Sequence, residues 1–206
     1  ILKNYTHNSL VQVVEGVGNS FDSMANTNKA ILKAYTAAPI IKEALKEPDN
    51  DIIKKRVQEY TIDYFSKLEG WEGIYLADWD SKVLTHPNDG AIGMILREGD
   101  SLSGLQHNML NAPDGVFNTG IMTSPVSGQL IMSMYTPVLD DDGNFIGAVQ
   151  RNYNLTDFTD LVKNEVVYAT QDIFIGDNNG DLIAHTSVDL ETGEAVNFST
   201  QAWYGE

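Results

Sequence analysis

The sequence predicts an α+β fold in which one long N-terminal helix precedes two tandem modules with antiparallel sheets. Three observations support this prediction. Apolar residues recur at helical spacing through the first 47 positions, short apolar runs separated by turn residues follow from residue 71, and one thirteen-residue pattern occurs twice, 99 positions apart. Helices followed by a run of strands are typical of α+β proteins, and a long repeat without gaps indicates a duplicated module.

Residues 1–47 are expected to form the long helix. Apolar positions alternate in steps of three and four, which is a heptad-like stripe, and no proline precedes Pro39. Two roles remain open: the helix packs along its own domain, or it forms the interface of a homodimer, with Asn28 setting the register as polar residues do in coiled coils. The stripe comprises Leu10, Val14, Val17, Phe21, Met24, Asn28, Ile31, Tyr35 and Ala38.

Shorter elements follow the long helix. Residues 47–51, Glu-Pro-Asp-Asn-Asp, end it and offer a cap for a second helix over about 51–68. Apolar runs bounded by turn residues then predict five strands with one inserted helix. The strands are expected at 72–78, 83–87, 116–123, 129–138 and 144–154, and the further helices at 102–110 and 156–164.

The repeated pattern is Ile74–His86 in the first copy and Ile173–His185 in the second. Each copy has an apolar strand, a polar turn that begins with Asp, a second apolar strand and a closing His, so the two histidines are expected to share a structural role. Only 21 residues follow the second copy, which suggests that the chain stops within its second module. The expected division is a long helix over 1–48, a ligand-binding module over 49–165 and an incomplete module over 166–206.

The composition excludes several classes of function. The chain is 42% hydrophobic with a net charge of −16, which argues against nucleic acid as a partner because phosphate binding needs a basic surface. It has no cysteine, so disulfides and thiolate chemistry are excluded. No apolar run reaches the roughly 20 residues that span a bilayer. The first residue is Ile, and we interpret the chain as a piece of a longer protein.

The motifs give no support to catalysis. The sequence has no Gly-x-Ser-x-Gly elbow, no phosphate-binding loop and no dinucleotide fingerprint, and no two of its four histidines have the spacing of a helical zinc site. The Asp-rich turns that end at Gly143 and Gly180 place apolar residues at the first ligand position of a calcium loop. We therefore expect no enzymatic activity, no cofactor and no metal.

Several of these segments resemble a known family. The hairpin Ile74–His86, the segments Ser124–Ser133 and Tyr135–Val138, and the turn Gly143–Gly147 are together similar to the double Cache domain, the extracytoplasmic sensor module of bacterial chemoreceptors, histidine kinases and diguanylate cyclases. The resemblance covers the whole chain. It implies tandem PAS-like modules, membrane tethering through flanking helices absent from this chain, and a small-molecule ligand in the first, membrane-distal module.

The amino-acid-binding branch of that family holds the ligand carboxylate with an Arg that Trp and Tyr follow, and the ammonium with acids on two strands. Arg97 matches the Arg, although no Trp-Tyr pair follows it. Met122 and Ser124 stand where the pattern has Tyr and Asp, and Asn152 stands where it has the strand Asp. Burying an unpaired ammonium is costly, so these departures argue against an amino acid or amine ligand.

These residues favour a small carboxylate as the ligand. Arg97 offers a planar donor fork that suits a carboxylate. A nucleobase such as uracil is the alternative, because Asn152 both donates and accepts hydrogen bonds. The alternative of another class is a dimerisation or structural module without a ligand. The expected ligand-binding residues are Arg97, Tyr75, Trp79, Met94, Met122, Ser124, Tyr135 and Asn152, with Tyr153 as a further wall.

Overall fold

The computed structural model describes residues 2–69, 71–154, 160, 162–164, 173–176 and 182–185. The chain divides into two compact units, one formed by residues 29–154 and the other by residues 1–28 with 155–206. All elements of the candidate site belong to the unit 29–154. Among the residues that are described, no helix combines the length and the apolar character needed to cross a bilayer.

Three helices come first: α1 over Leu2–Thr36, α2 over Pro39–Lys46 and α3 over Asp51–Phe65. The prediction of a single helix up to residue 47 is wrong, because the chain breaks before Pro39. Ala38 is extended, at φ −66° and ψ 130°, since a following proline disfavours the helical conformation. Pro39 then occupies the first position of a new helix, where its missing N–H costs nothing.

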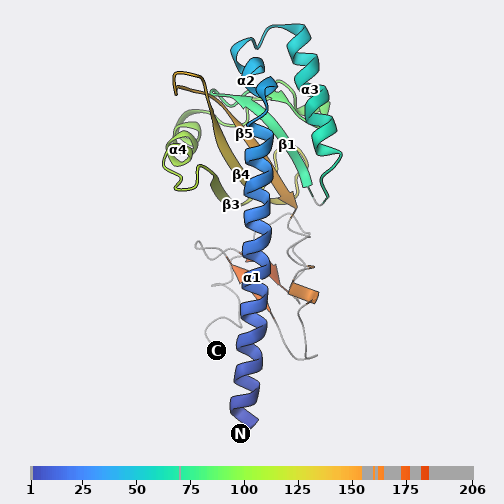
Figure 1. The fold of residues 1–206 in the computed structure, drawn as a ribbon, viewed down its shortest axis with the longest axis vertical. Coiled ribbons are helices and arrows are strands. Elements are labelled where there is room, and N and C mark those ends of the chain that lie inside the picture. Colours follow the sequence, from blue (N-terminus) through green and yellow to red (C-terminus); the bar gives the residue numbers. More distant parts are fainter. Residues whose placement is uncertain are drawn as a thin grey trace. The chain divides into compact units, whose positions relative to one another are not determined.

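Five antiparallel strands form one sheet in the order β2-β1-β5-β4-β3, so β5 lies in the middle (Figure 1). The connection from β2 to β3 contains a short 3-10 helix, η1 Asp89–Ala91, and helix α4 over Gly99–Leu110. The predicted fold class, the five strands and the inserted helix are confirmed. The strands are β1 Trp71–Asp78, β2 Val83–Thr85, β3 Phe117–Thr123, β4 Leu130–Leu139 and β5 Phe145–Asn154.

The two faces of the sheet carry different helices. Helices α2 and α3 pack against β5, β1 and β2, whereas α4 packs against β4. Successive side chains of a strand point to opposite faces, and β5 shows the change in one step. A Cβ on Gly147 would meet Leu45 of α2, whereas Ala148 belongs to a buried cluster with Leu105 and Met109 of α4. The face toward α4, called the α4 face below, contains the candidate site.

Buried hydroxyls join α1 and α3 to the sheet on the opposite face. The Tyr35 hydroxyl lies 2.7 Å from Thr61 Oγ1, which lies 2.9 Å from Thr85 Oγ1. Thr85 Oγ1 accepts from the backbone N–H of Leu76, beside a bulge in the pairing of β1 with β2. Burial raises the pKa of Tyr35 to about 12. The phenol therefore keeps its proton at neutral pH, and the buried hydroxyls satisfy one another.

The described part of residues 166–206 is a hairpin of β6, Phe174–Gly176, and β7, Leu182–His185. Ile175 pairs with Ala184 as Leu76 pairs with Thr85 in the first hairpin, and in both the register shifts at the next residue. The repeat in the sequence is thus also a repeat of strand pairing. The other residues of the predicted second module, and most of the predicted helix 156–164, lie outside the described residues.

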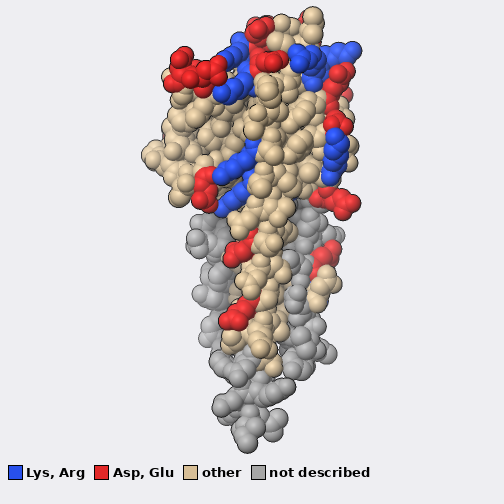
Figure 2. Space-filling model, in the orientation of Figure 1, with Lys and Arg blue, Asp and Glu red and all other residues tan. Residues whose placement is uncertain are grey.

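Basic side chains of the first helices meet acids from other segments. Lys42 and Lys46 contact Asp141, in the turn between β4 and β5, at 3.2 and 2.5 Å, and Arg56 lies 3.4 Å from Glu43. Figure 2 shows basic and acidic groups intermixed over this end of the unit. Each exposed pair contributes little to stability.

Gly147→Ala should lower the free energy of unfolding by about 1–3 kcal/mol, the usual cost of overpacking. The added Cβ would lie 2.6 Å from the carbonyl oxygen of Ala77 and 2.5 Å from a methyl carbon of Leu45. Chemical denaturation measures the change. Gly104→Ala is the matched control, because its added Cβ has nothing within 4 Å and alanine favours a helix over glycine. Equal effects of the two substitutions would contradict the close approach of α2 to β5.

Candidate ligand-binding site

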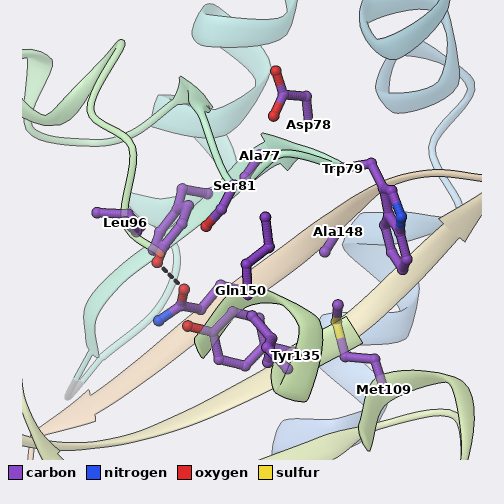
Figure 3. Close-up of a pocket in the computed structure, with 12 residues that line it drawn as sticks. Ala77, Asp78, Trp79, Ser81, Leu96, Met109, Tyr135, Ala148 and Gln150 are labelled. Atoms are coloured by element: carbon purple, nitrogen blue, oxygen red, sulfur yellow. Dashed lines mark hydrogen bonds between the residues drawn. The ribbon is translucent and has the colours of Figure 1, made fainter. Parts of the chain in front are cut away.

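Three polar side chains form a row across the α4 face. Gln150 of β5 pairs with Tyr75 of β1 on one side and with Tyr135 of β4 on the other, and residues opposite each other in neighbouring strands share a face. Leu105 and Met109 of α4 accompany them, and all five side chains are buried. Figure 3 shows the Tyr135 ring beside the Gln150 amide, with Met109 nearby. The strand register thus places a polar patch under an apolar cover.

An inner cavity and an open groove adjoin this patch, and Leu105 lines both. The inner cavity, which Tyr75, Tyr135 and Gln150 line, measures about 20 Å³, room for about one water molecule. The groove lies between α4 and β3 and measures about 420 Å³. A metabolite therefore has room in the groove, but it reaches the patch only if α4 or the segment before it moves.

Arg97 lines the groove and reaches the row of tyrosines. Its half-buried guanidinium donates to Ser101 Oγ at 3.1 Å and to Met122 Sδ at 3.7 Å. It also lies 5.9 Å from the centroid of the Tyr135 ring. In the described part of the chain, no acidic side chain forms an ion pair with Arg97. Because a thioether is a weak acceptor, the guanidinium can exchange it for a stronger, anionic one.

A buried chain of hydrogen bonds leads from the patch to Glu72 in β1. The Tyr75 hydroxyl donates to Gln150 Oε1, and Gln150 Nε2 donates to Asn152 Oδ1 at 2.7 Å. Asn152 Nδ2 then donates to Glu72 Oε2 at 2.8 Å. Ser133 Oγ joins the two amides, since it donates to Asn152 at 2.7 Å and accepts from Gln150 at 3.2 Å. The chain satisfies polar groups that would otherwise be costly to bury.

Burial keeps both phenols of the patch protonated. It raises the pKa of Tyr75 well above the usual value, and it also raises the pKa of Tyr135, although the charge of Arg97 opposes this second effect. Arg97 acts on Tyr135 as a nearby charge, since its guanidinium lies 5.9 Å from the centroid of that ring. A ligand at neutral pH therefore meets neutral hydroxyl groups.

A hydrogen bond joins α4 to the turn after β1. Gln106 Nε2 donates to the backbone carbonyl of Trp79 at 2.9 Å. Trp79 is itself fixed by stacking on Phe145, with ring centroids 5.4 Å apart. The bond between Arg97 and Ser101 lies at the start of α4 and joins the helix to the segment before it.

The structure brings five of the predicted residues to the two hollows. Tyr75, Trp79 and Tyr135 line the inner cavity, and Arg97 and Met122 line the groove. These residues come from β1, from the turn after it, from β4, from the segment before α4 and from β3. Both hollows border α4 through Leu105.

The other predicted residues are placed differently. Met94 is 37% exposed and lines neither hollow. Ser124 Oγ accepts from two backbone N–H groups of its own turn, so it stabilises the turn between β3 and β4. Asn152 lies on the α4 face, but its amide is used by the hydrogen-bond chain. The side chain of Tyr153 lies outside the described part of the chain.

Sequence reasoning missed Glu72, Ser133 and Gln150. Gln150 could have been found from the sequence, because two amides at positions 150 and 152 point to the same face of a strand. Glu72 could not, since it meets Asn152 only through the pairing of segments 80 residues apart. Seven residues of the groove were also missed: Asp100, Ser101, Gly104, Leu105, Asn108, Phe117 and Thr119.

His86 is built into the end of the first hairpin. Its Nδ1 accepts from the backbone N–H of Asn88 at 2.9 Å, and its ring lies 5.1 Å from that of Tyr75. The Gln58 side chain binds both the backbone N–H and the carbonyl of His86. Burial lowers the pKa of His86, although the nearby charge of Glu72 acts in the opposite direction. The equivalent side chain, at position 185, is not among the described ones.

Solved structures with a similar fold are sensor domains. The sensor domain of the V. cholerae histidine kinase DctB has a TM-score of 0.69 at 11% sequence identity, over 90% of this chain and 68% of that one. The sensory domain of the Campylobacter jejuni chemoreceptor Tlp3, with isoleucine bound, has a TM-score of 0.63 at 15% identity, over 85% and 69%. This chain has the fold of the Cache-type sensor domains. The ligand-binding domain of Mlp24, with asparagine, has a TM-score of 0.61 at 21% identity, over 94% and 74%.

The resemblance to Cache domains that the sequence suggested is therefore confirmed for the fold. No protein-family model and no curated protein matches the chain. The Cache domains named above are sensor and ligand-binding domains, not enzymes.

The stability of the domain should decrease below pH 6.5 through His86. Because burial lowers its folded-state pKa, the stability it contributes is complete above the ordinary histidine value, about 6.5, and is lost as pH falls from there toward the lower folded value. Urea denaturation between pH 7.5 and 5 would show wild type approaching His86→Asn in stability. His107→Asn, at an exposed helical position, should retain the wild-type slope. A constant difference between wild type and His86→Asn would contradict this account.

Proposed function

We propose that this chain is the ligand-binding sensor domain of a bacterial transmembrane signalling receptor of the chemotaxis type, and that it binds a small organic carboxylate. The ligand occupies the α4 face of the module 49–165, which would be the membrane-distal one on the outer side of the membrane. The Cache fold supports the sensor role. Membrane attachment would come from flanking helices that are not part of this chain.

The observation that supports a carboxylate is the position of Arg97. Its guanidinium lines the groove, forms no ion pair in the described residues and holds the weakest kind of acceptor, a thioether. A carboxylate that replaces Met122 Sδ gains a charge-assisted, bidentate partner. A ligand of about six heavy atoms has an affinity ceiling near −9 kcal/mol at about −1.5 kcal/mol per atom, which corresponds to micromolar binding.

The nucleobase alternative depends on a hydrogen bond from the ligand to the Asn152 amide. Both polar atoms of that amide are already hydrogen-bonded within the protein, to Glu72, Ser133 and Gln150. Asn152 also lines neither hollow. No observation on the α4 face therefore favours a pyrimidine over a carboxylate.

The argument against an amino acid rests on positions 124 and 152, where the amino-acid-binding pattern has acids. Both carry neutral side chains in this chain, and the polar atoms of both are used within the protein. The amino acids in Tlp3 and Mlp24 are ligands of those proteins. An ammonium brought here would need an anionic partner to offset its desolvation.

The size of the inner cavity connects binding with a conformational change. A ligand that enters the patch must displace α4 or the Arg97 segment, because the cavity has room for about one water. A sensor needs two such states, since a ligand shifts a population only when it binds one state better than the other. A structural or dimerisation module without a ligand is the alternative.

Arg97→Gln should weaken carboxylate binding by about tenfold to a hundredfold, because a hydrogen bond to a charged group contributes about 1.5–3 kcal/mol. Thermal shift with C2–C4 carboxylates, uracil and amino acids identifies the binding class, and calorimetry measures the loss. Arg56→Gln is the matched control, because Arg56 is an exposed residue of α3 that pairs with Glu43.

If ordinary amino acids stabilise the domain strongly and neither carboxylates nor uracil do, the argument from positions 124 and 152 is contradicted. A tight dimer that no small molecule stabilises would instead favour the structural module.

A further inference from the structure

The groove between α4 and β3 has a charged end and an apolar end. At the charged end, the Arg97 guanidinium donates to Met122 Sδ at 3.7 Å and to Ser101 Oγ at 3.1 Å. Further along, Phe117 packs against the buried cluster that contains Leu105, and both residues line the groove. A ligand that places a carboxylate at Arg97 therefore has an apolar wall available for the rest of its atoms.

Helix α4 lines the groove with one of its faces. Ser101, Gly104, Leu105 and Asn108 all border it, and they follow the spacing i, i+3, i+4, i+7 that places residues on one side of a helix. The first and last of these positions are about 10 Å apart along the helix axis. The glycine lies between them, one turn after Ser101, so the side of the groove that α4 forms lacks a side chain in its middle.

Gly104 has neither of the usual structural reasons to be a glycine. Its φ is not positive, and a Cβ built on it would meet nothing within 4 Å. Glycine is a poor helix former, so the helix loses stability at this position without gaining a close contact inside the protein. The missing side chain instead leaves space in the groove, between its charged end and its apolar end.

The charges around the groove favour a ligand with a single carboxylate. Among the described residues that line it, Arg97 is the only basic one and Asp100, in the first turn of α4, the only acidic one. A second carboxylate on the ligand would find no cation there, and an unpaired charge is costly to remove from water. At the far end of the helix face, Asn108 is neutral, so a charged group at the end of the ligand would have no ionic partner in that part of the groove.

We propose that the groove binds an aliphatic monocarboxylate, and that Gly104 is a specificity-determining residue that leaves room for its tail. The inference rests on the proposed function, in which Arg97 takes the ligand carboxylate. The tail then lies over Gly104 and against Leu105 and Phe117, where its burial removes apolar surface from water. Because Leu105 also lines the inner cavity, the tail touches the residue that borders both hollows.

Calorimetry on wild type with acetate, butanoate and hexanoate tests the proposal without any variant. The affinity should rise about twofold to fourfold with each added methylene, as expected when a CH₂ group is buried. Adipate and 6-aminohexanoate have the same number of carbons as hexanoate but a second charged group. Both should bind at least about tenfold more weakly than hexanoate, because that group is desolvated without a partner.

Two substitutions distinguish the tail from the carboxylate. Gly104→Phe fills the space over the helix, so the preference for hexanoate over acetate, at least about tenfold in wild type, should fall to about threefold or less. Ser103→Phe is the matched control, because it adds the same side chain at an adjacent exposed position that does not line the groove, and it should keep the preference. Arg97→Gln should weaken both acids by the same factor and leave their ratio unchanged.

The outcomes separate the two proposals. An affinity that does not increase with tail length in wild type overturns the inference, and so does an undiminished preference for hexanoate in Gly104→Phe. Adipate or 6-aminohexanoate that binds as tightly as hexanoate overturns it as well. In each of these cases, binding of acetate that is lost in Arg97→Gln leaves the carboxylate sensor standing. If no carboxylate binds, both proposals fall together.

Discussion

The central strand of the sheet imposes the main constraint on this module. β5 has a strand on each side and helices over both faces, yet it carries Gln150, Arg151 and Asn152 in succession, and all three are buried. Buried polar groups have to be hydrogen-bonded or otherwise compensated. Alternation sends the two amides to the α4 face and the arginine to the other, where its guanidinium lies over the Trp71 ring and gains a cation–π interaction. Many of the side chains around the sheet are therefore partners of these three residues.

On the α4 face, the proposed ligand site and this buried network share a side chain. Tyr75 lines the inner cavity and also donates to Gln150, so its hydroxyl cannot rotate freely to suit a ligand. Low local polarity strengthens such a network when it is complete and makes any unmatched group expensive. Ligand recognition at this site would therefore depend on the packing of the core. On the opposite face, Leu76 and Thr85 connect β1 to Tyr35 of α1 through buried hydroxyls, one residue from Ala77 of the cavity.

Local patterns predicted the elements well, since strand bounds depend on alternation and turn residues that lie close together in the chain. The repeat also indicated how the strands pair, because Ile74–His86 and Ile173–His185 have the same spacing and their hairpins have the same register. The break at Pro39 was missed because an apolar stripe continues across it. In the site, Arg97 was found from the family pattern and Tyr75 and Tyr135 were expected as aromatic walls, whereas Glu72 could not be found. It depends on a bulge in the pairing of β1 with β5, between Trp71 and Gly73, which no local signal records.

The position of Glu72 has a consequence for how related receptors are compared. It lines neither hollow, yet through Asn152 and Gln150 its carboxylate fixes which way the hydroxyl of Tyr75 points. Two receptors with the same wall residues would then recognise different chemical groups if they differed only at this acid. A classification of such sensors by pocket composition would place them together. A correct classification would have to trace the hydrogen bonds from the pocket to the first charged group, because a charged group can only donate or only accept.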